Sequence, residues 1–135
     1  MPKDKRGGKS IKKEPYAEYE EIGKANNGTI KVLKAKSETD NSSIPQFSNK
    51  ANTVYFITKE IDNADKVTSV AIYRGRKVIR NIDIDPILGD HYHVWQTKMV
   101  RGKTKQVKRT KHYFDLKASD KKLIQMALNW NSGGK

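Results

Sequence analysis

The chain has 135 residues, and its 28 lysines and arginines against 15 aspartates and glutamates give a formal net charge of +13. This length predicts one domain with one core. Cysteine is absent, which excludes disulfides, thiolate metal sites and cysteine nucleophiles. No apolar run approaches the ~20 residues that a membrane-spanning helix needs, and the basic N-terminal residues lack the apolar segment of a secretory signal peptide. We therefore expect no membrane insertion.

The positive charge is concentrated in two segments. Residues 1–13 carry a net +5, and residues 98–111 carry +7 because they contain seven basic residues and no acid. Concentrated positive charge is typical of proteins that bind a polyanion, most often nucleic acid. We expect residues 1–13 to form a disordered basic N-terminal tail and residues 14–135 to form a single globular domain.

Taken in order, the chain first predicts a short helix over residues 14–24, from the spacing of its apolar residues, and then a strand over residues 29–35. The segments that follow are rich in β-branched and aromatic residues and are separated by turn signals, which is typical of antiparallel strands. They predict a four-stranded meander over residues 53–59, 67–73, 77–85 and 91–96.

The C-terminal region predicts a helix. Ser119 suits an N-cap, Asp120 suits a first helical turn, and the apolar residues that follow recur with the spacing of an amphipathic helix. The fold class predicted is therefore α+β: an antiparallel β-sheet of about four or five strands, with the C-terminal helix packed on one of its faces.

Residues 78–96 hold the candidate site. Its two halves alternate with period two and flank a turn at Pro86–Asp90. A hairpin closed symmetrically about that turn would pair Asp85 with His91 and Asp83 with His93. Paired residues share a face, so both Asp–His pairs would lie on one face, with Ile and Tyr side chains on the other.

The first functional interpretation is a metal-independent RNase. His91 and His93 would act as general base and general acid, while Asp83 and Asp85 would orient the rings and tune their pKa values. This interpretation needs no cofactor and favours RNA as the partner, because the 2′-hydroxyl of RNA is the group that would lose its proton.

Basic and aromatic side chains near this site are predicted to contact the nucleic acid. Cationic groups would stabilise charge on phosphoryl oxygens, and Trp95 would stack on a base. The predicted nucleic-acid-binding residues are Arg80, Trp95, Lys98, Arg101, Lys103, Lys105, Lys108, Arg109 and Lys111. His112, beside Tyr113, is interpreted as a surface or edge-strand histidine rather than a catalytic residue.

Two other interpretations remain open at this point. The same Asp83, Asp85, His91 and His93 are suitable ligands for a divalent metal, so the protein could be a metal-dependent nuclease. Alternatively, the Asp–His pairs are ordinary cross-strand contacts, and the protein is a non-catalytic, basic nucleic-acid-binding module of a phage or mobile element.

An ordered set of motifs carries a family resemblance over about residues 44–131. It comprises residues 47–55, a hairpin around Ile72–Arg76, the Asp83-x-Asp85 element, the His91-x-His93-x-Trp95 element, and a closing helix with Trp130-Asn131. The set resembles small C-terminal toxin domains of bacterial polymorphic toxins and related phage and mobile-element proteins of Firmicutes. The chain departs from that pattern at residues 86–89, where no further histidine follows the Asp-x-Asp element.

The resemblance implies a toxin effector, with nuclease activity as the expected type. Its site of action would be the bacterial cytoplasm, with delivery to target cells as part of a larger secreted toxin as one route. A producing cell must protect itself from such a toxin, so the charge of +13 predicts an acidic immunity protein as a partner. Failure of an acidic candidate protein to form a complex would count against this expectation.

Overall fold

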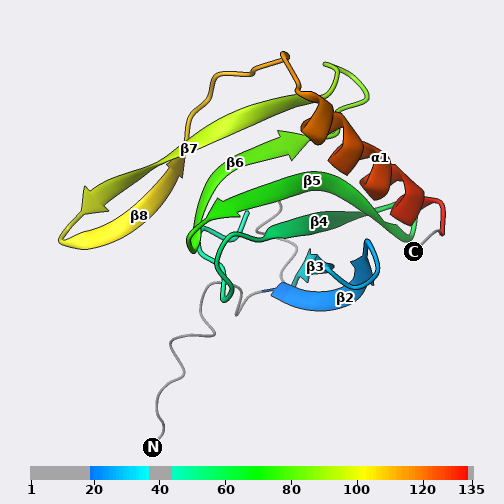
Figure 1. Cartoon of the computed structure of the whole chain (residues 1–135), viewed down its shortest axis with the longest axis horizontal. Coiled ribbons are helices and arrows are strands. Elements are labelled where there is room, and N and C mark those ends of the chain that lie inside the picture. Colours follow the sequence, from blue (N-terminus) through cyan, green and yellow to red (C-terminus); the bar gives the residue numbers. More distant parts are fainter. Residues whose placement is uncertain (1–18, 37–43, 134–135) are drawn as a thin grey trace, which may run out of the picture.

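The structure is a computed structural model that describes residues 19–36 and 44–133. Within these described residues, seven strands form one sheet in chain order (Figure 1): β2 (Tyr19–Ala25), β3 (Ile30–Ala35), β4 (Val54–Ile61), β5 (Ala64–Arg74), β6 (Lys77–Asp83), β7 (His91–Val100) and β8 (Lys103–Lys108). All neighbours are antiparallel except β3 and β4, which are parallel. The predicted α+β class is confirmed, whereas the predicted number of strands was too low.

The extra strands come from two segments that the sequence analysis did not assign as strands. Strand β2 occupies part of the predicted helix at 14–24, and a register shift between Glu21 and Gly23 interrupts its alternation. Strand β8 comes from the basic segment and pairs with the second half of β7. Residues 111–116 contribute only the bridge between Tyr92 and Tyr113 to the sheet. The predicted tail at 1–13 lies outside the described residues.

Helix α1 (Ala118–Asn131) lies across one face of the sheet (Figure 1), as predicted. Ile124 and Ala127 of the helix join a buried cluster that includes Phe56 and Val70. The side chain of Asn131 ties the end of the helix to β5, because its Oδ1 accepts from the Val67 N–H at 2.7 Å. Among the described residues, no helix is long and apolar enough to cross a membrane.

The start of the helix differs from the prediction. The N-cap is Lys117 rather than Ser119, and the cap is completed by Asp120, whose carboxylate accepts the Lys117 N–H at 2.9 Å. The same carboxylate oxygen lies 2.8 Å from Nη2 of Arg80 on β6. Asp120 is 1% exposed, so this ion pair fixes the start of the helix to the sheet in a largely dry environment.

The opposite face of the sheet has its own core. Tyr55, Tyr73 and Leu33 are buried there together with Ile44, which precedes β4 in the chain. The Tyr73 hydroxyl donates to the carbonyl of Pro45 at 2.6 Å, so the chain before β4 lies over this face. The side chains of β6 and β7 that lie next to this core on the same face are polar, and they form the candidate site.

We predict that Asp120→Ala lowers the free energy of unfolding by about 3 kcal/mol. The substitution removes the cap and leaves Arg80 without its carboxylate, and breaking a buried pair costs about 3–5 kcal/mol. Urea denaturation measures the loss. Asp115→Ala is the control, since it removes an exposed carboxylate that accepts one hydrogen bond from Tyr92 and should cost about 1 kcal/mol or less. Equal losses in the two variants would contradict this role of Asp120.

Candidate functional site

The β6–β7 hairpin brings the predicted residues to one face, in a register different from the expected one. Asp83 pairs with His91, and Asn81 pairs with His93. The predicted pairing of Asp85 with His91 and of Asp83 with His93 was therefore wrong by two residues. Because the shift is even, each side chain keeps its predicted face.

Asp85 accounts for the shift. Its carboxylate accepts the N–H groups of Ile87 and Leu88 at 2.8 and 2.9 Å, and its own N–H donates to Asp90. The hydrogen bonds from Leu88 and Ile87 lower the pKa of Asp85. Asp85 thus organises the turn and takes no part in the strand pairing.

Asp83 lies at the centre of the site. Its Oδ2 is 3.4 Å from Nε2 of His91 and 3.2 Å from Nε2 of His93. Its Oδ1 accepts hydrogen bonds from the hydroxyl of Ser69 and from the side-chain amide of Asn81, both at 2.8 Å. One oxygen therefore accepts hydrogen bonds from Ser69 on β5 and from Asn81 on the same strand, while the other is directed at both histidines.

Backbone carbonyls fix the orientation of the His91 and His93 rings through hydrogen bonds to Nδ1. Nδ1 of His91 lies 2.8 Å from the Gly89 carbonyl, and Nδ1 of His93 lies 3.1 Å from the Arg109 carbonyl. A carbonyl only accepts, so each Nδ1 carries a hydrogen and each neutral ring presents a lone pair at Nε2. His91 is 2% exposed and His93 is 5% exposed, so neither ring is free to turn.

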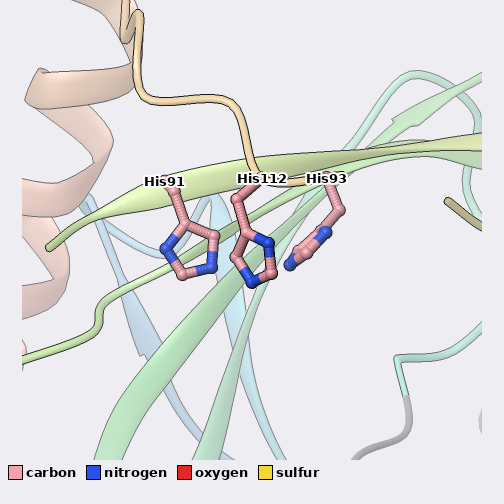
Figure 2. Close-up of side chains that lie close together, drawn as sticks. All are labelled: His91, His93 and His112. Carbon is pink, nitrogen blue, oxygen red and sulfur yellow. The ribbon is translucent and has the colours of Figure 1, made fainter. Parts of the chain in front are cut away.

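His112 completes the cluster and is the residue that the sequence analysis missed. Its ring centre is 4.5 Å from that of His91 and 4.7 Å from that of His93, and Figure 2 shows all three rings side by side. His112 is exposed, as predicted for it, but it is not isolated. One ligand atom from each histidine lies within 4.8 Å of the others. The signal available from sequence was that all three histidines of the chain lie within residues 91–112.

A stack of side chains on the other face of β7 holds His112 in place. The Arg80 guanidinium lies 4.2 Å from the centre of the Tyr92 ring. Tyr92 stacks on Tyr113 at 5.1 Å, and the two residues exchange backbone hydrogen bonds. Arg80 was predicted to contact nucleic acid, but it is engaged with Asp120 and Tyr92 and acts as a support for this stack.

A cavity of about 260 Å³ opens beside Asp83. Its lining includes Ser69 and Asn81, which orient Asp83, and two cationic side chains, Lys59 and Lys108. Lys108 was predicted as a phosphate contact, whereas Lys59 was not singled out. The carboxylates of Asp83 and Asp85 also line the cavity, and its connection to the histidine cluster is through Asp83.

The remaining basic residues lie on the β7–β8 hairpin, which extends away from the sheet (Figure 1), and on the segment that follows it. The side chains of Lys98, Arg101, Lys103, Lys105, Arg109 and Lys111 are all exposed. Lys98 lies directly opposite Lys105 in the ladder, an arrangement that is unfavourable between like charges. Within the described residues, no acidic side chain forms an ion pair with any of these six lysines and arginines.

Two aromatic side chains near the site, Trp95 and Phe114, differ in accessibility. Trp95 is half-buried, and its indole N–H donates to Asn81 at 2.8 Å. Phe114 is 56% exposed, and its ring centre lies 5.5 Å from that of His91. Phe114 is therefore the aromatic ring that is both accessible and next to the cluster.

Comparison with protein-family models, with curated proteins and with solved structures finds no match to this chain.

We predict that acid destabilises the protein through protonation of His93. The prediction applies with a chelator present, so that no metal ion is bound to the histidine cluster. Burial lowers the pKa of His93 below 6.5, against the opposing effect of Asp83. The unfolded chain then binds a proton before the folded chain does, so stability is highest above pH 6.5 and falls as the pH decreases toward the folded-state pKa. The slope from one such group is at most about 1.4 kcal/mol per pH unit.

Urea denaturation at a series of pH values measures this dependence. His93→Gln is the matched variant, since its amide can still donate to the Arg109 carbonyl but does not titrate. The difference in unfolding free energy between wild type and variant should change below pH 6.5 and stay constant above it. A difference that is the same at every pH would contradict the prediction.

Proposed function

We propose that this protein is a nuclease, with RNA as the favoured substrate, and that its chemical centre is the cluster of Asp83, His91, His93 and His112. The observation that carries the proposal is that Asp83, which contacts both buried histidines, lines a cavity together with Lys59 and Lys108, on the strand next to the basic β7–β8 hairpin. Cleavage of a phosphodiester needs proton transfer or a Lewis acid, and it needs cations for the phosphoryl oxygens. The cluster and its surroundings offer both kinds of group.

The binding surface proposed for the nucleic acid runs from the hairpin to the cluster. Lys98 and Lys105 repel one another across the ladder, and a phosphate between them would relieve that repulsion. Lys59 and Lys108 line the cavity beside Asp83, where they suit a phosphoryl group close to the cluster. Phe114 offers a stacking surface for a base next to the histidines.

The buried histidines alter the proposed division of roles. A general acid or base must come within hydrogen-bonding distance of the substrate, yet His91 and His93 are almost fully buried. His112 is the ring that can reach a substrate directly. In a metal-free mechanism His112 would therefore transfer the proton, and His91, His93 and Asp83 would position it and set its electrostatic environment.

One observation favours a second candidate, a basic module that binds nucleic acid without cleaving it. Nδ1 of His91 and Nδ1 of His93 each donate to a backbone carbonyl in the fold, as expected of histidines that only stabilise a sheet. The basic hairpin would then be the whole functional surface. The toxin role and the acidic immunity protein stay predictions under either candidate.

We predict that wild-type protein degrades a defined single-stranded RNA and that Asp83→Asn and His112→Ala slow this reaction by about 10²–10⁴-fold, the usual contribution of acid–base groups. Gel analysis of labelled RNA, with duplex DNA of the same sequence in parallel, measures the rates. Asp115→Asn is the control, because it makes the same chemical change on an exposed carboxylate outside the cluster. If wild type binds RNA but leaves both substrates intact, the binding module is the better account.

A second prediction concerns the hairpin. The double variant Lys98→Gln/Lys105→Gln should bind single-stranded RNA more weakly and with a smaller salt dependence. The slope of log K against log salt should decrease in magnitude by about 0.7 for each RNA phosphate that the variant no longer neutralises. Fluorescence anisotropy at several salt concentrations measures both effects.

The matched control is Lys121→Gln/Lys122→Gln, which removes the same charge from exposed positions of α1. This variant should keep the wild-type slope. Equal changes in the two double variants would mean that binding responds to net charge alone, and the hairpin would then have no special role.

A further inference from the structure

The Nε2 lone pairs of His91 and His93 face one carboxylate oxygen of Asp83, and no hydrogen lies between these three atoms. The Nδ1 hydrogens of His91 and His93 are directed at backbone carbonyls, so Nε2 of each neutral ring can only accept. Both Nε2 atoms face the same Oδ2 of Asp83, at 3.4 and 3.2 Å. Acceptors in this arrangement repel one another unless a cation lies among them.

The two separations between Asp83 Oδ2 and the buried histidines match those between ligands of a tetrahedral metal ion. Zinc binds histidine nitrogen at about 2.0–2.1 Å and carboxylate oxygen at about 2.0–2.2 Å, so two tetrahedral ligand atoms lie about 3.4 Å apart. The two distances from Asp83 Oδ2 to the histidines agree with this value. An ordinary hydrogen bond from a protonated ring to a carboxylate would be shorter, about 2.7–2.9 Å.

The contacts around the ligands have the pattern of a metal site. A metal-bound histidine typically donates its other ring N–H to a carbonyl or carboxylate, which fixes the tautomer and the orientation of the ring. The Gly89 and Arg109 carbonyls do this for His91 and His93. The free oxygen of a metal-bound carboxylate is usually hydrogen-bonded as well, and Ser69 and Asn81 do this for Asp83.

We propose that His91, His93 and Asp83 bind a divalent transition-metal ion of the zinc class, with His112 as the fourth ligand. Imidazole with one carboxylate suits Zn²⁺ better than Mg²⁺ or Ca²⁺, which prefer oxygen ligands alone. The three buried or half-buried ligands lie on adjacent strands of one sheet and are held rigidly. His112 lies on an exposed segment outside the strands, so it is the ligand that a water or a phosphoryl oxygen would replace.

The proposed metal binding depends only on the geometry of the folded protein. The role of the metal in cleavage, in contrast, rests on the proposed nuclease function. A bound ion would supply Lewis acidity at the edge of the lysine-lined cavity. This assignment also differs from the metal set expected from sequence, because His112 replaces Asp85, which is engaged in the turn after β6.

The test is Zn²⁺ binding by untagged full-length protein. The protein is first dialysed against a chelator, and the chelator is then removed by a second dialysis. Isothermal titration calorimetry should give one ion per chain. Zn²⁺ at 100 times its dissociation constant should raise the Tm by about 5–10 °C. His93→Ala and Asp83→Asn should lose Zn²⁺ binding. Ser69→Ala should weaken it by about 10–100-fold, as expected of a residue that orients a ligand. His112→Ala should weaken it less than His93→Ala does. Asp115→Asn should bind as wild type does.

A second measurement needs no variant and so does not depend on how the substitutions affect folding. In ¹⁵N spectra of the wild-type histidine rings, Zn²⁺ should shift the Nε2 resonances of His91 and His93 while their Nδ1 nitrogens keep their hydrogens. Failure of wild type to bind Zn²⁺ would overturn the proposal. So would wild-type affinity in His93→Ala, or displacement of the Nδ1 hydrogens by the ion.

The two proposals fail in different ways. Binding of Zn²⁺ with these ligands but no cleavage of any nucleic acid would establish the metal site and remove the nuclease. Cleavage at an undiminished rate in a chelator, by protein that binds no Zn²⁺, would remove the metal site and leave the metal-free nuclease.

Discussion

The candidate site depends on the way Asp83 is held. A carboxylate at the centre of three strands has two oxygens, and here they serve different neighbours. Oδ1 is satisfied by Ser69 from β5 and by Asn81 from its own strand, while Oδ2 is left for the histidines of β7. Because Asn81 also accepts from Trp95, the orientation of the carboxylate is coupled to the packing of the apolar core next to it. The chemistry of the site and the stability of the sheet are thus linked through one side chain.

The two faces of the sheet differ in polarity. The face under α1 is apolar and is closed by the helix. The other face is apolar only over part of its area, where Ile44 and Trp95 cover Tyr55 and Tyr73, and it becomes polar at β6 and β7. Polar groups buried at the border of a core must satisfy one another, which explains why Ser69, Asn81 and Trp95 form one connected hydrogen-bond network with Asp83.

Much of the candidate site was predictable from the alternation of side chains, since Asn81, Asp83, His91 and His93 share a face as expected. The register was not predictable, because it depends on the conformation of the turn. Asp85 uses its carboxylate for the backbone of Ile87 and Leu88, which ends β6 two residues earlier. Only an even shift preserves the faces, so the prediction of a shared face survived an incorrect register.

The errors elsewhere in the fold have similar causes. A register shift after Glu21 breaks the period of two in β2, so the apolar residues there show the spacing of a helix. The basic segment has no apolar face to indicate a strand, yet its residues 103–108 form β8 and pair with the second half of β7. Its turn is made by Arg101 and Gly102, both with positive φ, a conformation that glycine adopts without strain.

His112 shows what local patterns cannot predict, because its position depends on contacts between distant segments. Asp120 fixes the start of α1 and binds Arg80, Arg80 packs on Tyr92, and Tyr92 stacks on Tyr113. That series of contacts runs from the helix, through the sheet, to the residue next to His112. The helix therefore contributes to the cluster although it lies on the opposite face of the sheet. The accessible histidine is held by packing, whereas the two buried histidines are held by hydrogen bonds. A change in the packing beneath Tyr113 would therefore alter the position of His112 and leave His91 and His93 in place.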